Sequence, residues 1–131
     1  MLRILSMLMV LGWTNLACAD IVVIVNPAFT GSVTTDELAR LYTGRSSSLT
    51  AVNLAESQAI RAEFDQKGVG RSSAQLKAYW SKLVFTGKGS PPKELTSEAE
   101  MLTLIASDPQ AIGYVSSANV NDSVKVILTL N

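Results

Sequence analysis

The sequence predicts an α/β layer sandwich in which a mixed sheet is flanked by helices. Two observations lead to this fold class. Residues 21–25 read Ile-Val-Val-Ile-Val, a continuously apolar and β-branched run that is typical of a strand covered on both faces. Further along, segments with helix-capping signals alternate with short strand-like segments. Strands that alternate with helices favour a layered α/β domain.

Four helices are expected between these strands. Three begin with a capping box, in which Ser or Thr is followed three residues later by Glu or Gln. The pairs are Thr34 with Glu37, Ser72 with Gln75, and Ser97 with Glu100. A fourth helix is predicted over about 57–66, with Ile60 and Phe64 facing inward. Short strands are expected near 51–54, over 111–115 and over 124–128.

The helix over 72–85 has the clearest pattern. Its apolar residues fall at helical spacing and form one continuous face: Leu76, Tyr79, Trp80, Leu83 and Val84. We therefore expect Trp80 to lie in the core. Truncation of a buried Trp to Ala typically costs about 3–5 kcal/mol.

The segment 108–115 predicts the end of one helix and the start of a buried strand. Pro109 disfavours helical geometry at Asp108 and stops the helix that contains Met101, Leu102 and Ile105. Gly113 then lies among apolar neighbours. A residue without Cβ at such a position lets another backbone or a ligand come close.

The first nineteen residues predict a secretory signal peptide. A basic start at Arg3 is followed by an apolar run from Ile4 to Trp13 and by Ala17-Cys18-Ala19, a typical cleavage site. The run is too short to span a membrane. We expect cleavage after Ala19, a single domain over 20–131 and a periplasmic or secreted protein. A buried N-terminal helix is the alternative interpretation.

Cys18 leaves a second question open. Asn15-Leu16-Ala17-Cys18 partly matches a bacterial lipoprotein box, in which the cysteine becomes the lipid-bearing first residue. Asn15 departs from the usual leucine. Ordinary cleavage and lipidation at Cys18 therefore remain the two alternatives. Since Cys18 is the only cysteine, the chain has no intrachain disulfide.

Composition argues against most catalysis. The chain contains no histidine, so Ser-His and Cys-His pairs and the usual zinc ligands are missing. Ser90 and Lys93 have the spacing of a Ser-Lys pair, but two prolines between them indicate a loop. We expect no enzyme, no catalytic or metal residues and no cofactor. After signal removal the net charge is near −1, which predicts no strong attraction to nucleic acid or to an anionic membrane.

Two motifs carry a family resemblance. Ala111-Ile112-Gly113-Tyr114-Val115 after a helix, and the helix over 34–44 that ends in Tyr-Thr-Gly, are similar to segments of phosphate ABC transporter substrate-binding proteins. These are periplasmic receptors with two lobes around an anion. The resemblance covers most of the chain after residue 33 but only one lobe. It implies a single-lobe periplasmic-binding-protein-like (type II) domain.

The resemblance also implies where an anion would bind. The family's anion-binding turn corresponds to Gln58, Ala59 and Ile60, with Ser57 beside it and Arg61 retained one residue on. Compared with the family, the hydroxyl donors, the glycine and an upstream arginine near Asn53 are missing. The candidate anion-binding residues are therefore Ser57, Gln58, Ala59 and Arg61. The alternative is that Ser57 only caps the helix.

Two functions follow from this, besides the disfavoured enzyme. The first is an exported substrate-binding-protein-like domain that binds phosphate or another small oxyanion weakly and assists an uptake system, with an ABC permease as partner. The second is an envelope interaction or scaffold module that has kept the fold and lost the anion site. An exposed apolar patch would favour the second function.

Overall fold

The computed structural model describes residues 20–131, so the predicted signal peptide and Cys18 lie outside the described residues. A five-stranded sheet has the order β3-β2-β4-β1-β5. The strands are β1 (Ile21–Val25), β2 (Thr50–Leu54), β3 (Lys93–Leu95), β4 (Ala111–Ser116) and β5 (Lys125–Leu130). Strand β2 runs parallel to β3 and β4, whereas β1 runs antiparallel to β4 and β5. The sheet is therefore mixed, as the sequence predicted.

Strand β1 is an interior strand of this sheet. It pairs with β4 on one side and β5 on the other, and its five residues are all buried. The two edges of the sheet are β5 and β3, and β3 was not predicted from the sequence. This strand has only three residues, and its sequence Lys-Glu-Leu carries too little hydrophobic periodicity to be recognised.

The helices are α1 (Thr35–Tyr42), α2 (Ala59–Phe64), α3 (Ser73–Phe85) and α4 (Glu98–Ser107). All three predicted capping residues are N-caps: the side chains of Thr34, Ser72 and Ser97 accept backbone N–H groups. Helix α4 ends before Asp108, which is extended, as expected before Pro109. After α2 the spiral continues as one π-helical stretch, η1 (Asp65–Val69).

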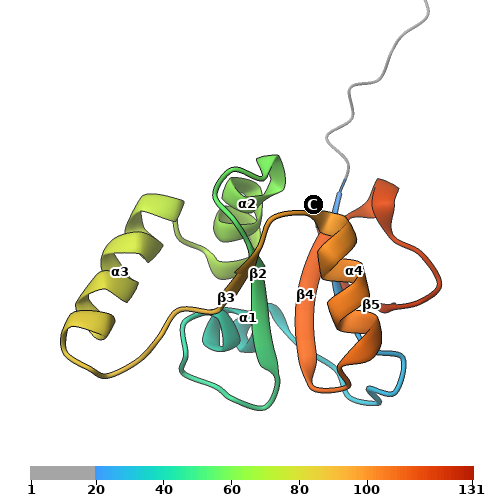
Figure 1. Ribbon diagram of the computed structural model, residues 1–131, viewed down its shortest axis with the longest axis horizontal. Coiled ribbons are helices and arrows are strands. Elements are labelled where there is room, and N and C mark those ends of the chain that lie inside the picture. The colour runs from blue at the N-terminus through green and yellow to red at the C-terminus, as the bar shows by residue number, and fades with distance from the viewer. Residues whose placement is uncertain (1–19) are drawn as a thin grey trace, which may run out of the picture.

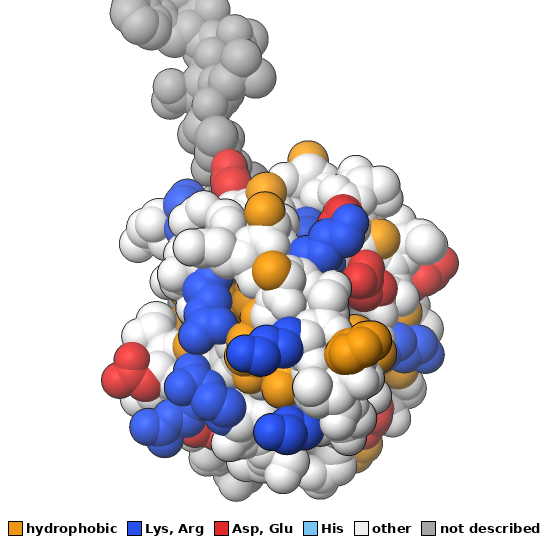
Figure 2. Space-filling view, turned by 90° about the vertical axis from the view of Figure 1, so that its left-hand side faces the viewer, with side chains coloured by type: hydrophobic (Ala, Val, Ile, Leu, Met, Phe, Trp, Pro, Cys, Tyr) orange, Lys and Arg blue, Asp and Glu red, His pale blue; other side chains and the backbone are white. Residues whose placement is uncertain are grey.

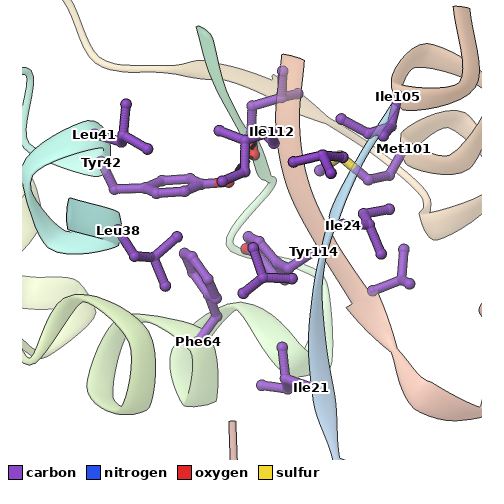
Figure 3. Packing of buried hydrophobic residues seen from close by; sticks show 14 of the residues in the cluster. Ile21, Ile24, Leu38, Leu41, Tyr42, Phe64, Met101, Ile105, Ile112 and Tyr114 are labelled. Carbon is purple, nitrogen blue, oxygen red and sulfur yellow. Dashed lines mark hydrogen bonds between the residues drawn. The ribbon is translucent and has the colours of Figure 1, made fainter. Parts of the chain in front are cut away.

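The core lies on both faces of β4 (Figure 3). The rings of Tyr114 and Phe64 stack on the face that α1 and α2 cover, where Tyr42 of α1 also lies. Met101 and Ile105 of α4 pack on the opposite face, against Gly113. Because successive residues of a strand point to opposite faces, Gly113 and Tyr114 lie on opposite sides of the sheet. Helices therefore cover both sides, α4 next to Gly113 and α2 next to Tyr114. This arrangement confirms the predicted layer sandwich.

The structure gives a different reason for a glycine at position 113 from the close approach of a backbone or ligand that we expected. A Cβ at this position would overlap Sδ of Met101 and lie 3.2 Å from Cδ1 of Ile105. The close approach is therefore made by side chains of α4, and neither a second backbone nor a ligand is needed to explain the glycine.

The environment of helix α3 differs most from the sequence-based prediction. It extends away from the sheet beyond β3 (Figure 1), and only Leu76 of its apolar face is buried. Trp80 is half-buried, Val84 is 53% exposed and Phe85 is 92% exposed. The expectation that Trp80 lies in the core is wrong. Helical spacing correctly showed which residues share a face, but the structure covers that face only in part: Tyr79, Trp80 and Leu83 are half-buried and Val84 is exposed.

Candidate functional site

The predicted anion-binding turn follows the carboxyl end of β2. In open α/β sheets, ligands commonly bind at this end of the strands. Ser57 and Ala59 are exposed there, and Gln58 is half-buried. The Gln58 side chain donates to the carbonyl oxygen of Thr96 at 2.7 Å, which ties the turn to the segment after β3.

Ser57 does not cap the helix. The N-cap of α2 is Gln58, and within the described part of the chain no side chain accepts a hydrogen bond there. The backbone N–H groups of Gln58 and Arg61 donate within the turn, to the carbonyl oxygens of Ala55 and Gln58. Among the described residues, the backbone N–H groups of Ser57, Ala59 and Ile60 have no hydrogen-bond partner. Three backbone donors of the turn are therefore left without a partner in the described part of the chain.

Arg61 lies apart from these donors because its side chain turns into the interior. It is buried, its Nε donates to both carboxylate oxygens of Asp65 at 3.0–3.2 Å, and its Nη1 donates to the carbonyl oxygen of Leu54 at 2.8 Å. Asp65 is fully buried and also accepts a hydrogen bond from Ser73 at 2.6 Å. The guanidinium charge is thus balanced by a neighbouring carboxylate. The spacing of four residues between Arg61 and Asp65 could have indicated this pair.

Asn53 stands where the resemblance placed the missing arginine. It is buried, and its side-chain oxygen accepts the hydroxyl of Tyr114 and the backbone N–H of Leu54. Burial raises the pKa of the Tyr114 hydroxyl, and burial likewise raises the pKa of Tyr42 well above its usual value. Both phenols are therefore neutral hydrogen-bond donors, and Asn53 is committed to the core.

Arg61 borders a cavity of about 500 Å³ between α3 and the body of the domain. We call this cavity the α3 groove; its apolar walls include Val69, Leu76, Trp80, Val84, Pro91 and Pro92. Its charged lining comprises two cations, Arg61 and Lys77, and three carboxylates, Glu56, Asp65 and Glu94. An excess of carboxylates makes the α3 groove a poor site for an anion. Sequence reasoning missed this groove because nothing in the sequence showed that α3 stands apart.

Within residues 20–131, no group of three or more carboxylates is arranged to hold a metal ion. None of the helices described in this range combines the length and the hydrophobicity that crossing a bilayer requires.

The fold of this chain resembles a part of each of several solved receptor structures. One is an ABC-type phosphate transport receptor from Vibrio cholerae, with 21% identity and a TM-score of 0.65, covering 83% of this chain and 45% of the receptor. Another is PstS from Borrelia burgdorferi, with 12% identity and a TM-score of 0.63 over 83% and 46% of the two chains. No protein-family model and no curated protein matches the chain.

A third similar structure is assigned as a phosphate ABC transporter substrate-binding protein from Clostridium perfringens and was solved with bound phosphate. It has 18% identity and a TM-score of 0.66, and the match covers 83% of this chain and 44% of that one. These structures are binding proteins, and the chain spans less than half the length of each. The chain has the α/β fold of a single periplasmic-binding-protein-like lobe.

Proposed function

We propose that this protein is an exported, single-lobe substrate-binding-protein-like domain that binds a small oxyanion weakly and has no enzymatic activity. Inorganic phosphate is the candidate ligand, because the similar structures are phosphate receptors. The observation that supports a site is the exposed turn after β2, where the N–H groups of Ser57, Ala59 and Ile60 have no partner among the described residues. Free backbone donors at the start of a helical segment attract anions.

The chemistry of the turn limits the affinity. Ser57 supplies the one hydroxyl of the candidate set, Glu56 places a like charge beside it, and the Arg61 guanidinium is engaged by Asp65. A single lobe also leaves the anion in contact with water, where each contact contributes less. We expect a dissociation constant no tighter than about 0.1 mM, or about −5.5 kcal/mol.

Isothermal titration calorimetry with inorganic phosphate tests this site. Ser57→Ala should weaken binding by removing a donor, and Glu56→Gln should strengthen it by removing repulsion. Ser47→Ala is the matched control, because Ser47 is exposed in a different loop and its side chain makes no hydrogen bond to residues 20–131. Micromolar affinity that neither Ser57→Ala nor Glu56→Gln changes would place the ligand elsewhere and refute the proposed site.

Export has its own test. We propose that the mature protein begins at Asp20 in the periplasm, where an ABC permease or another envelope protein is its partner. N-terminal sequencing of protein recovered from that compartment should read Asp-Ile-Val-Val. A blocked terminus at Cys18 with added lipid mass would instead establish the lipoprotein alternative.

A further inference from the structure

The charges of this protein are strongly divided along the chain. Residues 66–93, which contain α3, carry six basic residues and no acidic one: Lys67, Arg71, Lys77, Lys82, Lys88 and Lys93. The remaining described residues carry four basic and eleven acidic side chains. The near-neutral total therefore conceals a positive segment on a negative body. An asymmetry of this kind points to an anionic partner for the basic segment.

The fold displays this segment at one end of the molecule. Helix α3 extends beyond the β3 edge of the sheet (Figure 1). Figure 2 views the molecule from that end, where Lys and Arg side chains gather around exposed hydrophobic ones, and acidic side chains lie mainly toward the margins. This face of the molecule therefore carries a cluster of positive charge.

The end of α3 combines these charges with exposed hydrophobic side chains. Phe85 is 92% exposed and Val84 is 53% exposed, in the last turn of the helix. Gly87, with φ of +69°, reverses the chain, and the N–H of Lys88 donates to the carbonyl oxygen of Leu83 at 2.9 Å. Lys88 therefore returns over the last turn. We call Lys82, Val84, Phe85 and Lys88 the α3 tip.

The charged side chains that line a second hollow, beside the α3 tip, are all cationic. The hollow has a volume of about 330 Å³, and its lining includes Arg45, Trp80, Lys88 and Ser90 but no carboxylate. Arg45 is held in place because its Nε donates to the hydroxyl of Thr43 at 3.1 Å. This hollow can therefore accept an anionic group, whereas the α3 groove on the inner side of the helix is lined by three carboxylates.

A second copy of this chain does not suit the tip. Two copies that met symmetrically through α3 would bring two segments of six positive charges together. An acidic polypeptide would match the charge of the tip, but Val84 and Phe85 also border the α3 groove, whose three carboxylates would repel such a chain. An aromatic side chain on a protruding, basic end is suited to a flat anionic interface.

We propose that the α3 tip docks on an anionic phospholipid surface. Phe85 and Val84 enter the headgroup region, while Lys82, Lys88 and Arg45 contact lipid phosphates. The acidic body then faces away from the bilayer, which orients the molecule. This docking does not depend on phosphate binding at the turn after β2, so either proposal can fail without the other.

Vesicle co-sedimentation of the full exported protein tests the docking. The probes are vesicles of phosphatidylcholine alone and of phosphatidylcholine mixed equally with phosphatidylglycerol, at about 0.01 M salt, where screening is weak. Binding is expected only to the anionic vesicles and should fall as salt is added. Lys88→Gln should lower the partition coefficient about fivefold. Phe85→Ser should lower it about tenfold.

Two matched variants serve as controls. Lys125→Gln also removes one positive charge, and Val126→Ser also removes an exposed hydrophobic side chain, but both lie on β5 at the far edge of the sheet. Neither should change the partition coefficient. Equal binding to both kinds of vesicle, no binding to the anionic ones, or equal losses in tip and control variants would overturn the proposal. Tip-dependent binding to poly-L-glutamate without vesicle binding would overturn it in favour of an acidic protein partner.

Discussion

The ring of Phe64 lies flat on the ring of Tyr114, with centroids 3.6 Å apart and an interplanar angle of 6°. This contact joins α2 to the middle of β4, and the edge of Tyr42 from α1 packs on Phe64 at 4.7 Å. Three elements that are distant in the sequence therefore meet at one aromatic cluster. The cluster holds the segment after the candidate anion turn against the sheet.

The first prediction concerns this cluster. Phe64→Ala should lower the free energy of unfolding by about 3–5 kcal/mol, since the side chain is fully buried and its removal leaves a cavity. Phe85→Ala is the matched control, because Phe85 is 92% exposed and its removal leaves none. Urea denaturation followed by circular dichroism measures both. Similar effects of the two substitutions would contradict the packing described here.

A second prediction concerns the pair between Arg61 and Asp65. Arg61→Leu leaves the fully buried Asp65 carboxylate without its cation, and we expect a loss of about 3–5 kcal/mol of stability. Lys67→Leu, which breaks the exposed contact of 3.9 Å with Glu63, should change stability by less than about 1 kcal/mol. Thermal unfolding at neutral pH compares the two. If Arg61→Leu were as mild as Lys67→Leu, Arg61 would be in solvent and available to an anion.

Gly113→Ala is the third prediction. The added methyl group would overlap Met101 on α4, and overpacking of this kind costs about 1–3 kcal/mol. Gly89→Ala should be nearly neutral, since a Cβ there would first meet the Trp80 ring at 3.5 Å, an ordinary contact distance. Combining Gly113→Ala with Met101→Ala should cost less than the sum of the separate effects. Additive effects would mean that α4 does not press on this residue.

The fourth prediction is a pKa. Hydroxyl hydrogen bonds from Ser46 and then Ser48 hold the pKa of Glu37 below its ordinary value. Ser46→Ala should raise that pKa, whereas Ser47→Ala should leave it unchanged, because Ser47 does not contact the carboxylate through a hydrogen bond. The titration of the Glu37 side-chain carbon by NMR reports both variants.

The sign of the associated stability change follows from the same shift. Since the folded state lowers the pKa of Glu37, these hydrogen bonds stabilise the fold above the unfolded pKa, and the contribution is lost as pH falls through the folded pKa. Wild type and Ser46→Ala should therefore differ in stability at neutral pH and converge in acid. A difference that persists at low pH would assign the effect of Ser46 to another contact.

Local signals explain which parts of the fold could be predicted. The buried run of β1 and the three capping residues depend on neighbours in the sequence, and the structure contains each of them. The partial exposure of the apolar face of α3 could not be predicted, because periodicity identifies a shared face but not what packs against it. Trp80 was misplaced for this reason.

Prediction of the candidate site from the sequence was limited for a similar reason. The position of the turn after β2 follows from the alternation of strand and helix, so Ser57, Gln58 and Ala59 could be placed together. The direction of the Arg61 side chain could not, because it depends on where α2 packs. Asp65 falls within the predicted helix over 57–66, four residues after Arg61, so their pairing could have been expected; the burial of the pair could not, because it depends on tertiary packing.

The pairing of β1 has a consequence for how the protein acquires its structure. The first strand of the described chain pairs only with the last two, β4 and β5, so this side of the sheet is assembled from residue pairs that are 87 to 109 positions apart in the sequence. Such long-range pairing folds slowly compared with local contacts. A nascent chain that has not yet emerged beyond residue 111 cannot complete the sheet. The domain therefore reaches its native fold only when nearly the whole chain is available.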